Sequence, residues 1–524
     1  MYIAKINIEN YRCLNKIEVD FVSGLNVIIG ENNSGKSALI RAISLFFDSK
    51  SRTNFCKHDF YQGIKDFTKP PAINIFLVIR SSGKDTIDDR ALVATWLTKF
   101  ESPWEAQLTF KFFLPEKDEK DFIAGLGQSP KEIDFWQTVE EYLPKYISRI
   151  YAGNPDAQIK AEPEWLNKFG YHFLDSIRDV ESELFSGSNP LLKNMLLSTL
   201  DQDLAGAANE NLQKKARRKE FLANSDKLKD TLKNRLKLDS LFDLIKHTGA
   251  AMGGTPKISG TIEEEDILAA LKMFIESDLK YELPINYNGL GYNNLIYISL
   301  VLAYLNSKTD AKLQGENTVV FPILSIEEPE AHLHPALQYK LLKYIKSRVE
   351  KQESRQVFIT THSTQITAAS GLYPLICMYN TTDGIKIAYP GKVFSVDSQG
   401  IESKKYVERF LDATKSNMLF SKGVIFVEGI AELLLVPVFA DYKGKSLEDK
   451  YVTVIASGGL TFKHFLPLFG AVTKADLQQY SLKRKVACII DRDPARKEKI
   501  QNAKFKTCWP FLLGIDTSAL SSLD

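Results

Sequence analysis

The chain has 524 residues, 44% of them hydrophobic and 25% charged, which predicts about three or four globular domains and argues against a largely disordered protein. Its 67 basic and 65 acidic residues nearly cancel, which excludes a uniformly basic nucleic-acid coat protein but allows a local basic track. Five widely spaced cysteines without CxxC spacing, no long apolar run and no signal-peptide pattern predict a reduced, cytoplasmic protein that does not contact membranes.

The first 48 residues predict two strands, a turn and a third strand, followed by a glycine-rich loop and a helix. The apolar run Val27-Ile28-Ile29 predicts a strand before this loop, and apolar residues at helical spacing from 39 to 46 predict a helix after it. Another strand is expected over 73–79. This order predicts that residues 1–100 form the N-terminal half of an α/β domain.

The next segment, 101–280, is charged and predicts a mostly helical insertion that is a candidate for dimerisation. Within it, residues 214–237 carry ten basic and three acidic residues. Such a helix can contact phosphates, expose a solvated charged face or form a dimer contact, and the sequence does not separate these alternatives. Strand and helix signals then return in 281–395, a linker is expected at 396–421, and 422–524 reads as a further α/β domain.

The glycine-rich loop, GENNSGKS, fits the phosphate-loop pattern GxxxxGK[ST]. Its glycines let backbone N–H groups turn toward phosphate oxygens, its lysine reaches the β- and γ-phosphates, and its last hydroxyl holds Mg²⁺. Because the loop lies between a predicted strand and a predicted helix, an unspecialised glycine turn is a weak alternative. The predicted cofactor-binding residues are Gly30, Asn32, Asn33, Ser34, Gly35, Lys36 and Ser37.

A second half of the ATP site is predicted far downstream. The apolar run 319–326 ends in Glu327 and Glu328, of which the first is expected to hold hydrated Mg²⁺ and the second to polarise the attacking water. Paired glutamates alone are more often a solvated strand end, but the phosphate loop favours the functional interpretation. A strand at 357–361 ends in His362, which is placed to sense the γ-phosphate.

A glycine-rich turn containing Gly289 and Gly291 opens an apolar helix between these two halves. A helix N-terminus of this kind suits an anion, so the turn is a further candidate for nucleotide binding. A lone GxG pattern is weak, and its position in the order of motifs supports the assignment.

With these motifs the chain resembles the ABC-type head ATPases of the RecF, Rad50 and SMC group over residues 1–95 and 260–395. The resemblance rests on IENYR at 8–12, on the phosphate loop and on EEPEAHLHP at 327–335 as Walker B motif and D-loop. It departs from that group in having glutamate as the first Walker B acid and in lacking an LSGGQ-like signature.

This resemblance implies that Arg12 lies near the nucleotide. It also implies that the turn with Gly289 and Gly291 completes the site of a partner protomer, so a homodimer or higher homo-oligomer is expected. His332 and His334 have metal-like HxH spacing, but within this motif they are expected to shape the D-loop.

The C-terminal region places acids at the ends of predicted strands. Residues 424–427 run into Glu428, with Glu432 one turn later, and 486–490 run into Asp491 and Asp493. Loops at the carboxyl ends of neighbouring parallel strands share one crevice, so these acids can converge. A carboxylate cluster favours Mg²⁺ or Mn²⁺, and two such ions can hold the attacking and leaving oxygens of a phosphodiester. Either motif alone is usually a solvated loop.

This βαβαβ segment resembles a Rossmann-like Toprim domain. The whole chain, an α/β ABC-type (RecF/SMC-like) ATPase head with a mostly helical insertion followed by Toprim, resembles the OLD (overcoming lysogenization defect) family of ATP-dependent nucleases. That family includes the nuclease subunit of the Gabija anti-phage system and retron-associated effectors.

The family resemblance implies ATP and Mg²⁺, or Mn²⁺, as cofactors, DNA as substrate, and a helicase-like or reverse-transcriptase partner in phage defence. It makes Glu428, Glu432, Asp491 and Asp493 metal ligands, with Glu428 and both aspartates catalytic. The family continues well beyond its DxD motif, so the Toprim domain is expected to be incomplete, since 31 residues follow Asp493.

Basic residues surround the DxD motif, which favours a polyanionic substrate such as DNA over unspecialised surface charge. They are Lys483, Arg484, Lys485, Arg492, Arg496, Lys497 and Lys499. Two rival functions remain. One is an SMC-like ATPase that clamps DNA and has a non-catalytic Toprim domain, and the other is a repair or recombination ATPase whose nuclease is a separate chain.

Overall fold

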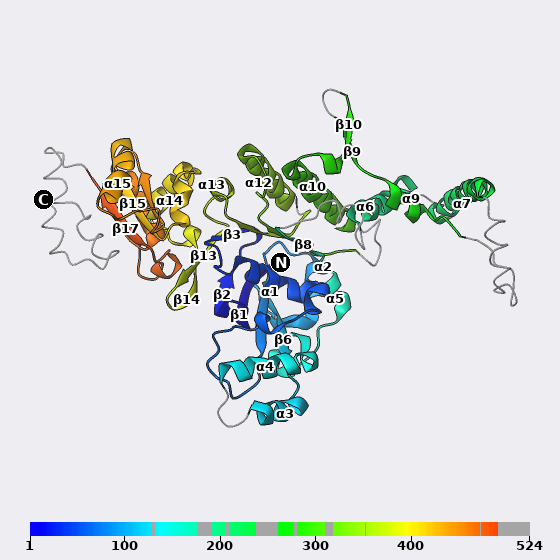
Figure 1. Ribbon diagram of the computed structural model, residues 1–524, viewed down its shortest axis with the longest axis horizontal. Helices are drawn as coiled ribbons and strands as arrows, with labels where there is room; N and C mark the ends of the chain where they lie inside the picture. Colours follow the sequence, from blue (N-terminus) through cyan, green and yellow to red (C-terminus); the bar gives the residue numbers. More distant parts are fainter. Residues whose placement is uncertain are drawn as a thin grey trace. The chain divides into compact units, whose positions relative to one another are not determined.

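The computed structural model divides the chain into two compact units, Met1–Ser176 with Val320–Asp524, and Ile177–Val319 (Figure 1). No helix among the described residues is both long and apolar enough to cross a membrane. The structure describes residues 1–126, 131–176, 190–204, 209–236, 260–276, 280–309, 318–351, 353–471 and 473–490.

A six-stranded sheet forms the centre of the first unit, and all its neighbouring strands are parallel except the edge pair β14 and β13. Every residue of β3, β11 and β12 is buried, as expected for a parallel sheet covered on both faces. Their carboxyl ends meet at one edge, where the phosphate loop and the Walker B acids follow. The strand order is β14 (Gly384–Ala388), β13 (Leu375–Thr381), β3 (Gly24–Gly30), β12 (Gln356–Thr361), β11 (Ile323–Glu327) and β8 (Tyr171–Leu174).

An antiparallel sheet shares its core with the helix α1 (Lys36–Phe47) that follows the phosphate loop. In β4 alternate residues are fully buried, so one face of this strand packs into the core. The strand order is β2 (Leu14–Asp20), β1 (Tyr2–Tyr11), β4 (Ile73–Arg80), β6 (Glu105–Phe113) and β5 (Leu97–Lys99), with β7 (Ile147–Ala152) paired to β6.

Residues 101–176, predicted as the start of the mostly helical insertion, contain three strands as well as helices. Strands β6 and β7 extend the antiparallel sheet, and β8 pairs with β11 in the parallel sheet. Two charged helices, α3 (Glu116–Leu126) and α4 (Glu132–Tyr142), separate β6 from β7 and dominate the local composition. The strands therefore belong to the first unit, and the second unit begins only at Ile177.

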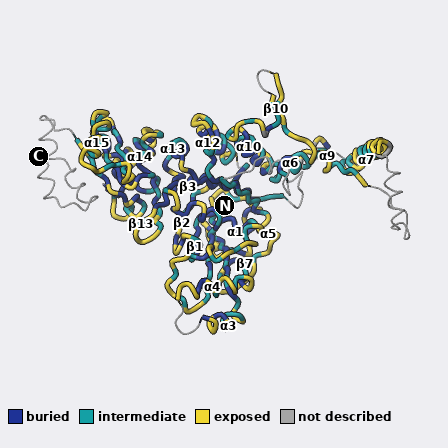
Figure 2. Tube along the Cα trace, in the orientation of Figure 1, coloured by how far each residue is buried: buried dark blue, intermediate teal, exposed yellow. Residues whose placement is uncertain are grey.

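The second unit is mostly helical where it is described. Its basic helix α7 is largely exposed (Figure 2), and Arg217 pairs with Asp201 and Asp203 at 2.7 and 2.6 Å. Arg218 pairs with Glu263 at 3.1 Å, so part of the positive charge is already balanced within the unit. The elements are α6 (Leu191–Thr199), α7 (Glu210–Arg235), α9 (Glu264–Ala270), β9 (Phe274–Glu276), β10 (Glu282–Pro284) and α10 (Leu290–Thr309).

The C-terminal region contains a parallel three-stranded sheet in the order β16 (Val452–Ala456), β15 (Gly423–Val427), β17 (Lys485–Ile489). Helix α15 (Ile430–Tyr442) connects β15 to β16, as predicted. The second apolar run, before β17, forms short 3-10 turns instead of the predicted α-helix, because Pro467 and Gly470 interrupt it.

The segment 396–421, predicted as a linker, is folded. It forms α14 (Ser398–Phe410) and a 3-10 turn at Lys415–Leu419. The ring of Tyr406 stacks on His464 with centroids 4.4 Å apart, and Ser403 Oγ lies 3.0 Å from Nδ1 of the same histidine. Packing against the turn that holds His464 makes this segment part of the C-terminal region.

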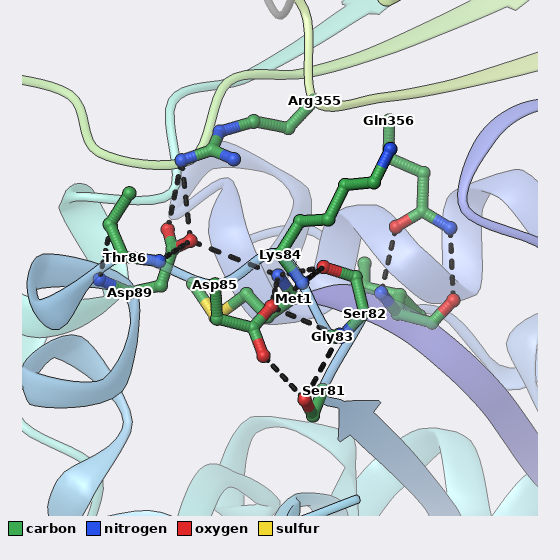
Figure 3. A network of polar contacts seen from close by, with 11 residues as sticks. Met1, Ser81, Ser82, Gly83, Lys84, Asp85, Thr86, Asp89, Arg355 and Gln356 are labelled. Carbon is green, nitrogen blue, oxygen red and sulfur yellow. Dashed lines mark hydrogen bonds and ion pairs between the residues drawn. The ribbon is translucent and has the colours of Figure 1, made fainter.

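A buried polar network fixes β12 against β1 and against the short helix α2 (Ile87–Leu92) (Figure 3). The Gln356 amide accepts a hydrogen bond from the Ile3 N–H at 2.7 Å and donates to the Ile3 carbonyl at 2.9 Å. Arg355 Nη2 lies 3.0 Å from Oδ1 of Asp89, whose side chain is fully buried. The strand that leads to His362 is thus anchored at its start.

Substituting Asp89 with alanine is expected to lower the free energy of unfolding by about 3 kcal/mol, because it leaves the Arg355 guanidinium without its buried carboxylate. Urea denaturation followed by circular dichroism measures the change. Asp88→Ala is the matched control, since Asp88 is exposed on the same helix. Equal stability of the two variants would contradict an anchoring role for the ion pair.

Candidate active sites

The phosphate loop has the backbone geometry that its glycines predict. Gly30 has a positive φ of 156°, and a Cβ there would lie 2.0 Å from the Met378 carbonyl oxygen. Gly35 has φ 91°, and Asn33 adopts the left-handed region at 60°. The loop leads into the N-terminus of α1, whose first turn carries no acidic residue. This arrangement suits a phosphate group.

Lys36 points back across the loop and is almost buried, with 6% of its surface exposed. Its ammonium donates to the carbonyl oxygens of Gly30 at 3.1 Å and Glu31 at 2.9 Å. Burial lowers the pKa of Lys36, whereas the nearby acids Glu328 and Glu330 oppose this shift. The lysine therefore lies where the loop and the Walker B acids meet.

The side chains of Ser37 and Glu327 are the two candidate oxygen ligands for Mg²⁺ in the ATP site. Burial raises the pKa of the Glu327 carboxyl group, and the nearby Ser37 hydroxyl acts to lower it. The Ser37 side chain comes from the first turn of α1 and Glu327 from the end of β11. A hydroxyl beside a buried carboxylate fits Mg²⁺, which prefers hard oxygen ligands.

Glu328 leaves the strand with an unusual backbone. It has φ 45°, a conformation that non-glycine residues rarely adopt and that occurs at functional sites. Its Oε1 lies 3.3 Å from His362 Nε2. Burial and the neighbouring Glu330 raise the pKa of Glu328, while burial and the Lys36 charge lower the pKa of His362. The imidazole of His362 therefore adjoins the predicted base.

Glu330 is not among the functional residues that the sequence motifs predict, yet its carboxylate organises the turn after β12. Its Oε1 accepts from the Thr361 hydroxyl at 2.6 Å and from the N–H groups of His362 and Ser363 at 2.7 and 3.0 Å. Glu330 thus positions the backbone of His362. The only sequence signal is that it is the third acid of the EEPE motif.

Arg12 is held beside the antiparallel sheet. Its Nε donates to Asp59 Oδ1 at 2.8 Å, and its N–H donates to the Asp59 carbonyl at 2.8 Å. The Arg12 charge acts to lower the pKa of Glu327, opposing the effect of burial. This places the guanidinium within electrostatic range of the Walker B acid, while contact with a nucleotide stays a prediction.

Gly289 and Gly291 lie at the start of α10 in the second unit, as the predicted turn requires. The amide of Asn293 donates to the Ile285 carbonyl at 2.8 Å and ties the helix start to the preceding 3-10 turn. A Cβ on Gly289 would meet nothing within 4 Å. The role of this turn in a partner's nucleotide site stays a prediction.

Of the four predicted Toprim acids, the structure describes Glu428 and Glu432. Glu428 follows β15, and its carbonyl accepts from the Gly459 N–H at 2.9 Å, which joins the loops after β15 and β16. The Glu432 carboxylate accepts from the Gly429 N–H at 2.9 Å and so caps α15. Asp491 and Asp493 lie outside the described residues, and within those residues no group of three or more His, Cys, Asp or Glu is placed to hold a metal.

The phosphate loop and the Walker B acids define an ATPase site, and the C-terminal region adds a parallel sheet with an acid directly after β15. Family comparisons place the chain more narrowly. Residues 1–367 match the AAA ATPase domain family, and residues 419–493 match the TOPRIM domain of overcoming lysogenization defect protein-like proteins. The chain therefore belongs to the AAA ATPase domain family and carries an OLD-like TOPRIM domain.

Curated relatives combine low identity with long coverage. Endonuclease GajA of Bacillus cereus is 23% identical over 510 residues, covering 85% of this chain and 68% of the relative. The OLD nuclease of Thermus scotoductus is 22% identical, covering 82% of this chain and 72% of the relative. Septu protein PtuA of Bacillus thuringiensis is 21% identical, covering 72% of this chain and 76% of the relative.

Proposed function

We propose that this protein is an ATP-hydrolysing, metal-dependent DNA endonuclease of the OLD type that acts in anti-phage defence. The observation that carries the proposal is that one chain joins a complete phosphate loop and Walker B pair to a parallel Toprim sheet with an acid at its strand end. The relatives named as endonuclease and nuclease support this assignment.

In the proposed ATP site, Lys36 exchanges its loop carbonyl partners for phosphate oxygens. Ser37 and Glu327 hold Mg²⁺, which supplies charge neutralisation at the phosphates when bound. Glu328 accepts the proton of the attacking water, and His362, 3.3 Å away, orients that carboxylate. Glu330 holds the turn of His362 and thereby fixes this geometry.

In the proposed nuclease site, Glu428 and Glu432 hold divalent metal together with Asp491 and Asp493. Mg²⁺ is the expected ion and Mn²⁺ an alternative, because all four ligands are carboxylates. We further propose that the ATPase head comprises 1–176 and 320–395, with 177–319 inserted and Toprim following from 422. The protein is expected to act in the cytoplasm, with a helicase-like or reverse-transcriptase partner.

The direct test is to incubate the purified protein with supercoiled plasmid and short duplexes, with Mg²⁺ or Mn²⁺ and with or without ATP. Metal-dependent nicking or linearisation is the expected result. ATP hydrolysis without cleavage under every metal condition would favour the alternative, an SMC/RecF-like DNA-clamping ATPase whose Toprim domain does not cut or cuts only with a partner.

Assembly gives a separate prediction. The turn with Gly289 and Gly291 serves ATP only if it faces another protomer, so the protein is expected to be at least a dimer. Light scattering of the Glu328→Gln variant with ATP and Mg²⁺ measures the mass under conditions that retain the nucleotide. A strict monomer both with and without ATP would show that the turn with Gly289 and Gly291 does not complete the nucleotide site of another protomer.

A further inference from the structure

A side chain from the Toprim region reaches the phosphate loop. Arg484 lies immediately before β17, and its Nη2 is 2.7 Å from Oε1 of Glu31. Glu31 is the second residue of the GxxxxGK[ST] loop. The side chains are 6% and 17% exposed, so this ion pair is largely shielded from water.

The residues around Arg484 hold its guanidinium in place beside Glu31. Its guanidinium carbon lies 4.8 Å from the ring centroid of Tyr379 on β13, and the Tyr379 hydroxyl accepts from the N–H of Lys483 at 3.3 Å. The buried Nε of Arg484 has no hydrogen-bond partner among the described residues. Burying a guanidinium is unfavourable unless an opposite charge compensates, and Glu31 supplies the carboxylate in contact with it.

The backbone of Glu31 also contacts two other residues of the phosphate loop. Its carbonyl oxygen accepts from Lys36 Nζ at 2.9 Å and from the Ser34 N–H at 3.3 Å. The side chain of one loop residue is therefore held by the Toprim region, while its backbone holds the lysine that must reach the phosphates. Displacement of Glu31 would change the resting geometry of the whole loop.

We propose that Arg484 is a positioning residue of the ATP site, through which the Toprim domain fixes the phosphate loop by way of Glu31. The proposal rests on the proposed function, since it assumes that the loop binds ATP. A loop held in place before ATP arrives loses less conformational freedom on binding, which increases affinity. Removing the pair is thus expected to weaken ATP binding while hydrolysis at saturating ATP changes little.

A double-mutant cycle tests the proposal in the full chain. Glu31→Gln and Arg484→Met are each expected to raise the Kd of a fluorescent ATP analogue, and the KM for ATP, about five- to tenfold, with kcat within about twofold. The double variant is expected to lose no more than the larger single loss, because both substitutions break one contact. Arg484→Lys, which retains the charge, is expected to recover part of the affinity.

Lys483→Met is the matched control. Lys483 adjoins Arg484 in sequence, but its ammonium donates to the Gln478 carbonyl at 2.7 Å and not to the loop, so unchanged ATP affinity is expected. Lys36→Ala tests the ATP site itself. Wild-type affinity in Lys36→Ala would refute the proposed function, whereas wild-type affinity in Glu31→Gln would refute this proposal alone.

Additive losses in the double variant would also overturn the proposal, because they would show that the two residues act separately. Thermal unfolding of each variant separates positioning from stability. If Arg484→Met does not fold, Glu31→Gln still decides the question, since it keeps the size of the Glu31 side chain and changes no residue of the Toprim core.

Discussion

Glutamine at position 328 is expected to slow ATP hydrolysis about 10²- to 10³-fold while the Kd for ATP stays within a few-fold of wild type. The amide keeps the size of the carboxylate but cannot take a proton from the attacking water. The Glu328 Oε1 lies 3.3 Å from Nε2 of His362, the histidine after β12. Phosphate release under single-turnover conditions measures the rate.

A matched control for this variant is Glu350→Gln, an exposed acid at the end of α12 (Pro335–Glu350) that should hydrolyse ATP normally. Lys36→Ala should instead lose binding and hydrolysis together. Hydrolysis at the wild-type rate by Glu328→Gln would show that another group activates the water, and Glu330 would then be the next residue to test, because it adjoins Glu328.

The ATP site could be predicted from sequence because its parts are contiguous motifs with local backbone requirements. Gly30 and Gly35 have the positive φ that the phosphate-loop pattern implies, and the strand before the loop is buried throughout. Glu327 follows from the end of an apolar strand. Each of these features depends on a few neighbouring residues and needs no knowledge of the rest of the fold.

The roles of Glu330 and Arg484 could not be predicted in this way. Glu330 acts on a turn 31 to 33 residues downstream, and Arg484 meets Glu31 across 453 residues of chain. The strand β8 also escaped detection, because four residues are too few to show periodicity and only its pairing with β11 identifies it. The roles of Glu330 and Arg484 and the existence of β8 all depend on contacts between residues far apart in the sequence.

The predicted adjacency of the Toprim strands is confirmed by their register. Strands β15 and β17 are parallel neighbours, with Val427 opposite Ile489, so the chain leaves both strands at the same edge of the sheet. Glu428 follows one strand immediately, and Asp491 follows the other after one further residue. Arg484 lies at the opposite end of β17, which separates its effect on ATP from that of the acids.

The double variant Asp491→Ala, Asp493→Ala is therefore expected to reduce DNA cleavage at least about 10²-fold, because it removes carboxylates needed to hold divalent metal. ATP hydrolysis is expected to stay within about twofold, since both changes lie outside the phosphate loop and the Walker B motif in the sequence. Plasmid nicking and phosphate release measured on the same preparation give both values. Asp476→Ala, an exposed acid of the same region, is the control that should cleave normally. Intact cleavage by the double variant would refute the nuclease assignment and leave the DNA-clamping ATPase as the better interpretation.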